Sequence, residues 1–195
     1  MRLTTCLFAS FLLIGPLAAG AEERLSVCYN YSCLSQTEVV YSDEQLIELA
    51  HMFLGRRDAM EEREAISVAV GRMLGWAGKQ SPISADRGGN YLDGAVYGMM
   101  DCIDHSTTTT RLLRLMEKQG WLRYHRVLEP ELRRRFLVFE HYSAQIEDVS
   151  DVQLLHSGVS TERYVVDSWF FDNGHPAVVM PLAAWLAGDG PDVGE

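Results

Sequence analysis

The hydrophobic periodicity of the chain changes at Gly120, and this change restricts the fold more than any other feature of the sequence. Before Gly120, apolar residues recur at the three- and four-residue spacing of a helix in segments 43–54, 58–77 and 102–119. After it, segments rich in Val, Phe, Tyr, Trp and Leu, with partial alternation, cover 121–128, 136–146 and 163–171. Helices followed by consecutive strands indicate an α+β fold with an antiparallel sheet.

Capping residues indicate where two of these helices begin. Ser42 with Gln45, and Asp101 with Asp104, have the three-residue spacing of a capping box, in which each side chain accepts the backbone N–H of the other residue. Between and after the long elements, we predict an extended arm or edge strand at 27–41, a solvated turn at 133–135 and a short helix at 180–187.

The first 21 residues have the pattern of a secretory signal peptide. Arg2 precedes an apolar run, and Ala19 and Ala21 supply small residues at the cleavage positions. The run at 7–17 is short for a stable membrane span, so an uncleaved anchor is the weaker alternative. The sequence therefore predicts an exported protein, periplasmic or secreted, with a single domain over 22–187 and a flexible tail over 188–195.

The charge of the chain excludes some partners. Its formal net charge is −10, and it has no long basic run. Such a chain is not expected to bind nucleic acid or, beyond the signal peptide, an anionic membrane. The charge is interpreted as a solubility feature.

The cysteines divide into a pair and a single thiol. Removal of the signal peptide leaves Cys28, Cys33 and Cys102. Cys28 and Cys33 flank a turn-like segment, and an oxidising compartment would allow them to form a disulfide. Cys102 is then unpaired, which indicates either a reactive thiol or an inert buried one.

Cys102 is expected at the first position of a helix, directly after the cap Asp101. The positive end of the helix dipole favours a thiolate over a thiol. His105, one turn later, offers a second interpretation, in which Cys102 and His105 form a metal or redox site. Two ligands do not make a zinc site, however, and Cys28 and Cys33 lack the usual short spacing.

A cysteine nucleophile needs a base, and the base needs a partner that fixes its tautomer. His141 lies in the second predicted strand, and Asp167 lies in the third within an apolar run. A carboxylate in such a context must be paired, because unpaired burial is costly. The alternative bases are His125, which lies in the first predicted strand and is interpreted as a solvated strand residue, and His156, which lies in a loop without an acid placed one strand later.

Three motifs together resemble the transglutaminase-like superfamily, in particular its bacterial cysteine proteinases. They are Asp-Cys-Ile-Asp at a helix start, a histidine at the head of a strand, and Val-Asp-Ser-Trp one strand later, within roughly 97–174. The resemblance implies a papain-like core, with N-terminal helices and a catalytic helix packed on an antiparallel sheet. It also implies that Cys102 is the nucleophile, His141 the general base and then acid, and Asp167 the residue that orients His141.

The resemblance also bears on the remaining site residues. The backbone N–H of Cys102 is the expected oxyanion donor, and Tyr97 or Asn90 is a candidate second donor. Some family members have an acidic residue after the nucleophile as part of a calcium site, but Ile103 stands there in this chain. We therefore expect no cofactor, with Asp101 and Asp104 as helix caps and a calcium or other cation site between them as the alternative.

These features lead to one main hypothesis and two alternatives. The main one is an exported cysteine hydrolase or acyltransferase that cleaves a peptide or protein amide through a thioester. Water would resolve the thioester in a peptidase or amidase, and a lysine amine in a transglutaminase. The alternatives are a non-catalytic papain-like binding module and a metal or redox protein that uses Cys102 and His105. The sequence does not indicate the oligomeric state.

Overall fold

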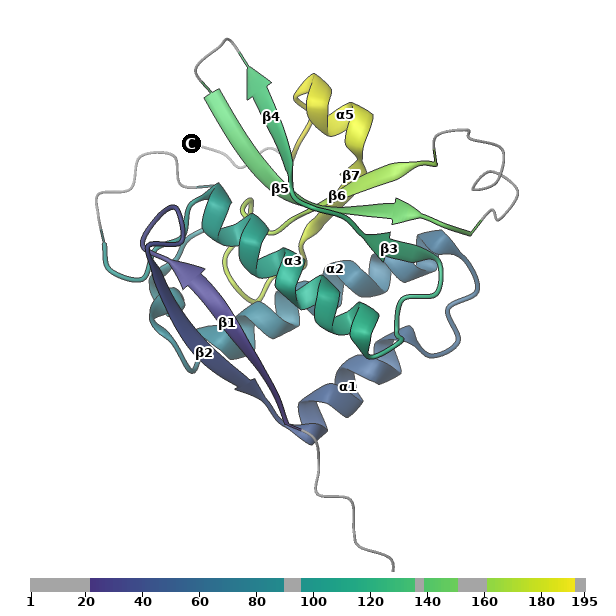
Figure 1. Ribbon diagram of the computed structural model, residues 1–195, viewed down its shortest axis with the longest axis horizontal. Helices are drawn as coiled ribbons and strands as arrows, with labels where there is room; N and C mark the ends of the chain where they lie inside the picture. Colours follow the sequence, from purple (N-terminus) through teal and green to yellow (C-terminus); the bar gives the residue numbers. More distant parts are fainter. Residues whose placement is uncertain (1–21, 90–95, 136–138, 151–160, 192–195) are drawn as a thin grey trace, which may run out of the picture.

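The computed structural model describes residues 22–89, 96–135, 139–150 and 161–191 (Figure 1). The predicted signal peptide lies outside these ranges. Among the helices within them, none combines the length and apolar character that a membrane crossing requires. The elements in chain order are β1 (Glu23–Tyr29), β2 (Ser35–Tyr41), α1 (Asp43–Phe53), α2 (Ala59–Gly78), the 3₁₀ helix η1 (Pro82–Ala85), α3 (Cys102–Lys118), β3 (His125–Val127), β4 (Glu131–Arg135), β5 (Phe139–Asp148), β6 (Arg163–Asp167), β7 (Val178–Pro181) and α5 (Leu182–Ala187).

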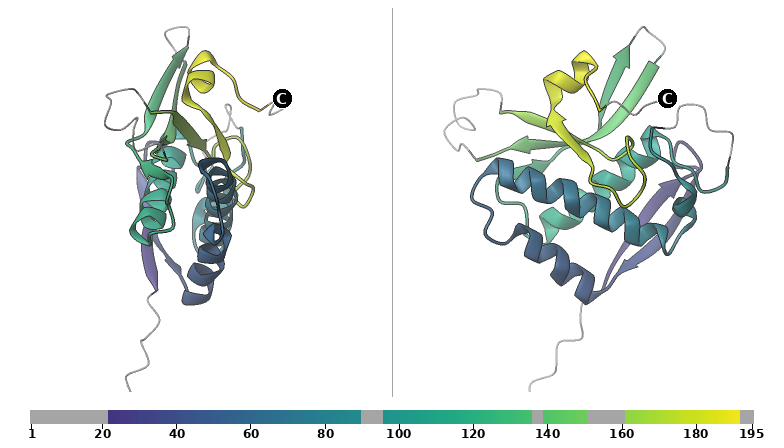
Figure 2. Two further views of the ribbon diagram at one scale, coloured as in Figure 1. Left: turned by 90° about the vertical axis from the view of Figure 1, so that its right-hand side faces the viewer. Right: turned by 180° about the vertical axis from the view of Figure 1, so that it is seen from behind.

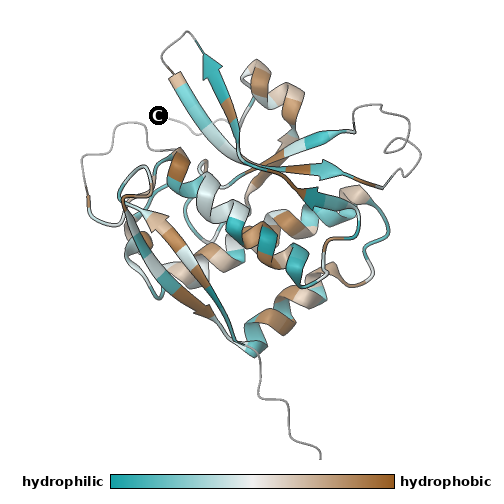
Figure 3. Ribbon diagram, viewed as in Figure 1, coloured by the Kyte–Doolittle hydropathy of each residue, from teal (hydrophilic) through white to brown (hydrophobic). Residues whose placement is uncertain are grey.

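The predicted α+β class is confirmed, because helices dominate before residue 120 and antiparallel strands after it. In the side view, α3 and the β1–β2 hairpin form one layer, and α1 with α2 forms another (Figure 2). The larger sheet covers one end of both layers. The ribbon of α3 carries both hydrophilic and hydrophobic residues (Figure 3). Its apolar residues Leu112, Leu113 and Met116 are fully buried in the core.

Both predicted capping boxes are present. Ser42 and Gln45 exchange hydrogen bonds at the start of α1. Asp101 and Asp104 do the same at the start of α3, and therefore Cys102 is the first helical residue. This cap is local in sequence and determines where the thiol emerges from the helix.

The larger sheet is built around β5. β6 pairs with β5 in antiparallel register, Ala144 opposite Val166, and β7 pairs with the far side of β6. The other side of β5 pairs with β3 near residue 147 and with β4 over Phe139–Ser143. α3 packs against β5, which brings the start of the helix close to the strand that carries His141.

The solvated turn predicted at 133–135 is wrong, because these residues belong to β4. Arg133 is buried, and its guanidinium lies 4.6 Å from the centre of the Trp185 ring. It donates a hydrogen bond to the Trp185 carbonyl over 2.7 Å. An arginine can bury its stem and stack its planar head on an indole, so three successive arginines did not prevent a strand.

The segment predicted as an extended arm or edge strand is a β-hairpin of β1 and β2. A Cys28–Cys33 disulfide closes its turn, as predicted. The four consecutive residues Asn30–Cys33 have φ between 53° and 67°, in the left-handed region that non-glycine residues seldom adopt. A disulfide of this kind persists in a non-reducing compartment.

Candidate active site

Cys102 is half-buried at the N-terminus of α3, and among the described residues it is the free cysteine. The amides in the first turn of a helix have no intrahelical acceptor, and the Cys102 N–H is the first of them. The thiol therefore lies beside free N–H groups and at the positive end of the helix dipole.

His141 and Asp167 lie on one face of the sheet. Since Ala144 lies opposite Val166, Ser143 is level with Asp167 at the end of β6, and His141 is one pleat further along β5. The Nε2 atom of His141 is 2.7 Å from Oδ2 of Asp167. The hydrogen bond to Asp167 uses Nε2, which leaves Nδ1 as the ring nitrogen that faces other partners.

Two further N–H groups hold the Asp167 carboxylate. The indole Nε1–H of Trp185 donates to Oδ2 over 3.0 Å, and the backbone N–H of Trp169 donates to Oδ1 over 3.2 Å. Trp185 is fully buried on α5. Both carboxylate oxygens are thus satisfied, and the residue cannot rotate away from His141 without breaking hydrogen bonds.

The surroundings of His141 favour its charged form. Burial lowers the pKa of the imidazole, but hydrogen bonds and charge interactions with Asp167 and Cys102 outweigh burial and raise the pKa from 6.5 to about 9. The rings of Trp169 and Trp185 lie 5.0 and 5.7 Å from the imidazole centre. Aromatic faces attract a cation, so an imidazolium is stabilised in this environment.

Asp101 and Asp104 act as caps and also hold the disulfide-closed turn. Asp101 accepts from the backbone N–H of Ser32, and Asp104 accepts from those of Tyr31 and Cys33, over 2.7–2.8 Å. Together with the capping box, these bonds give every carboxylate oxygen a backbone donor. Burial and the nearby Asp101 charge raise the pKa of Asp104 to about 6.

Oxygen atoms that face N–H donors are poorly oriented toward a cation. The described residues hold one group of potential ligands with suitable mutual distances, formed by Cys28, Cys33 and Asp104. The two sulfurs of this group are bonded to each other.

The other predicted residues lie elsewhere. Tyr97 is 66% exposed, and its hydroxyl lies 3.3 Å from that of Tyr29. Asn90 and His156 lie outside the described residues. The prediction that His125 is a solvated strand residue is wrong, because its ring is buried between Glu62 and Arg63, with Nδ1 2.9 Å from the carboxylate and Nε2 3.2 Å from the guanidinium.

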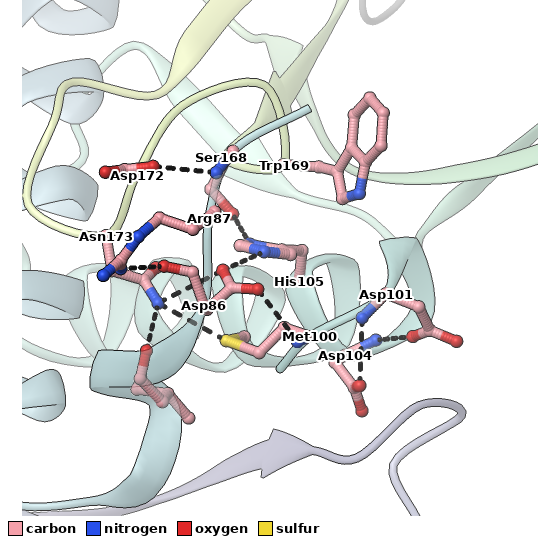
Figure 4. Close-up of polar contacts among 12 residues, drawn as sticks. Asp86, Arg87, Met100, Asp101, Asp104, His105, Ser168, Trp169, Asp172 and Asn173 are labelled. Atoms are coloured by element: carbon pink, nitrogen blue, oxygen red, sulfur yellow. Dashed lines mark hydrogen bonds and ion pairs between the residues drawn. The ribbon is translucent and has the colours of Figure 1, made fainter. Parts of the chain in front are cut away.

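His105 pairs with residues that are not recognisable from the sequence. Its Nε2 is 3.0 Å from Oδ2 of Asp86, and its Nδ1 is 2.9 Å from the Ser168 hydroxyl (Figure 4). Thr109 lies 2.8 Å from the same hydroxyl. Both ring nitrogens of His105 are therefore occupied, which leaves none for a metal shared with Cys102. The contacts from Ser168 through His105 to Asp86 have the connectivity of a hydrolase triad. Ser168 is only 7% exposed, however, so its hydroxyl is not presented to a substrate as a nucleophile would be.

Asp86 binds the backbone on the other side of Cys102. Its Oδ1 accepts from the Met100 N–H over 2.9 Å, and Asn173 donates to its Oδ2 over 3.4 Å. Figure 4 shows Asp86 between His105 and Asn173. The sequence signal for this network was limited to a histidine one turn after the cysteine.

No protein-family model, curated protein or solved structure matches this chain.

Proposed function

We propose that the protein is an exported cysteine hydrolase or acyltransferase that acts on peptide or protein amides, with Cys102, His141 and Asp167 as its catalytic residues. One observation carries the proposal: Nε2 of His141 is 2.7 Å from a buried carboxylate at the end of β6, and Cys102, at the start of α3, helps to raise the pKa of the same imidazole. This connectivity is the one a cysteine nucleophile needs, because the base must be oriented and charged.

In the first half of the reaction, the thiol proton passes to Nδ1 of His141, and the sulfur attacks the carbonyl carbon of the substrate. The developing oxyanion is stabilised by the N–H of Cys102. The carbon–nitrogen bond then breaks, and the leaving amine takes the proton from His141. A thioester on Cys102 remains.

In the second half, water or a second amine attacks the thioester carbonyl. His141 accepts the proton of this nucleophile and returns it to the sulfur as the carbon–sulfur bond breaks. Asp167 holds the imidazole in place and stabilises its charge in both halves. The disulfide and the signal-like segment 1–21 support export as part of the proposal.

The test uses iodoacetamide at about pH 6, where an unperturbed thiol is almost wholly protonated. We expect Cys102 to be labelled much faster than a free thiol. The rate should fall at least about tenfold in His141→Ala, because the protonated imidazole that stabilises the Cys102 thiolate is lost. His51→Ala, which removes an exposed histidine on α1, is the matched control and should label like wild type. Wild-type labelling no faster than that of a free thiol would refute the proposal.

A further inference from the structure

We infer that His105 is a positioning residue, which fixes the helix that carries Cys102 against the strand end that carries Asp167. The inference rests on the proposed function, since the residues it positions are the proposed catalytic ones. Cys102, His105 and Thr109 are spaced by three and four residues on α3, so they lie on one side of the helix. His105 and Thr109 both contact Ser168, the residue directly after Asp167.

Consecutive side chains at the end of β6 point in different directions. Asp167 reaches His141, whereas the hydroxyl of Ser168 reaches α3. The start of α3 and the end of β6 are therefore connected in two ways. His105 contacts Ser168, and His141, which interacts with Cys102, is bonded to Asp167. A displacement of Ser168 along the helix would move the carboxylate that orients the imidazole.

The second ring nitrogen of His105, Nε2, connects the helix to the backbone that precedes Cys102. Through this nitrogen His105 holds Asp86, and Asp86 accepts from the Met100 N–H, two residues before the nucleophile. Cys102 thus lies between two points that this buried pair fixes, Met100 and His105. Asp86 and His105 are each 1% exposed, so solvent does not replace these bonds.

Two substitutions separate the two halves of this arrangement. In His105→Asn the amide stands close to the position of Nδ1, so the contact with Ser168 can be kept and the contact with Asp86 lost. In His105→Gln the amide stands close to the position of Nε2, which keeps Asp86 and loses Ser168. If His105 acts through Ser168, the Asn variant should label like wild type within about threefold, and the Gln variant about tenfold more slowly, with iodoacetamide at about pH 6.

A role limited to stability predicts something else. Both variants would then unfold at lower urea concentration, and the pH dependence of labelling of the folded protein would match that of wild type. We expect instead that the rise in labelling rate moves to higher pH in His105→Gln. Equal pH profiles in wild type and both variants would overturn the inference.

Ser168→Ala provides a test that leaves the Asp86–His105 pair intact, should a His105 variant not fold. We expect it to fold and to label about tenfold more slowly at pH 6, like His105→Gln, and wild-type labelling in this variant would overturn the inference. The proposed function fails in a different measurement, namely slow labelling of the wild-type protein itself. The two failures are therefore distinguishable.

Discussion

Two histidine–aspartate pairs lie beside the start of α3, His141–Asp167 and His105–Asp86. In both pairs Nε2 contacts the carboxylate, and the pairs differ in the other group that contacts the imidazole. In the His141–Asp167 pair, Nε2 is bonded to the carboxylate, Cys102 interacts with the same ring and raises its pKa, and 8% of the His141 side chain is exposed. In the His105–Asp86 pair, Nδ1 meets the hydroxyl of Ser168, and the two side chains are 1% and 0% exposed. The same two residue types thus form one pair that interacts with a half-buried thiol and another that is sealed by hydrogen bonds.

The difference shows that a histidine–carboxylate contact does not by itself indicate chemistry. A sealed pair whose nitrogens are both satisfied can hold segments together, because breaking it leaves a buried group unpaired. A pair in which the carboxylate holds only one ring nitrogen leaves the other nitrogen able to take up or release a proton. The neighbours of the histidine, more than its carboxylate, separate the two roles.

The largest expected effect concerns stability. His105→Ala should lower the free energy of unfolding by about 3–5 kcal/mol, since it leaves Asp86 buried without its main partner. His141→Ala should cost clearly less, because Asp167 keeps the N–H groups of Trp169 and Trp185. Urea unfolding of both variants measures the difference, and equal losses would remove the distinction between a sealed and an open pair.

Asp167→Asn tests the open pair by removing its charge. The carboxylate raises the pKa of His141, so the amide should lower that pKa from about 9 by at least about one unit. Activity that needs a protonated His141 is lost as the pH rises through this value, and therefore the loss should begin at lower pH in the variant. An NMR titration of the His141 ring measures the shift, with Asp43→Asn on α1 as the control. An unchanged His141 titration would show that Asp167 does not set the charge of the imidazole.

Trp185→Phe should have the smallest effect. It keeps an aromatic ring beside His141 but removes the N–H that donates to Asp167. We expect a stability loss of about 1 kcal/mol, typical of one hydrogen bond, and a slight rise in the pKa of His141, because the carboxylate then has one donor fewer. Trp76→Phe on α2 is the control for loss of an indole ring. A His141 pKa that falls in Trp185→Phe would contradict this account.

The parts of the fold that depend on neighbouring residues could be predicted from the sequence. The capping boxes at Ser42 and Asp101 are examples, since each involves residues three positions apart. β4 could not be predicted, because the burial of Arg133 depends on Trp185, which is far along the chain. The charge of the three successive arginines at 133–135 therefore led to the prediction of a turn.

The candidate site divides in the same way. An aspartate in an apolar run must have a partner, which made Asp167 recognisable. His105 stands one turn after Cys102, which led to the metal alternative, but its partners come from the segments around residues 86 and 168. Only the fold brings those segments together.

The uneven pairing of β5 has a consequence for amide hydrogen exchange. Ile146 and Glu147 pair with β6 on one side and β3 on the other, whereas the half of the strand around His141 pairs with β4 alone among the described strands. Amides in a strand segment that is paired on both sides open only with the whole domain, and those in a segment paired on one side open locally. Deuterium should therefore enter near His141 well before it enters at Ile146, so the end of β5 with the imidazole can adjust while the end beside β3 remains closed.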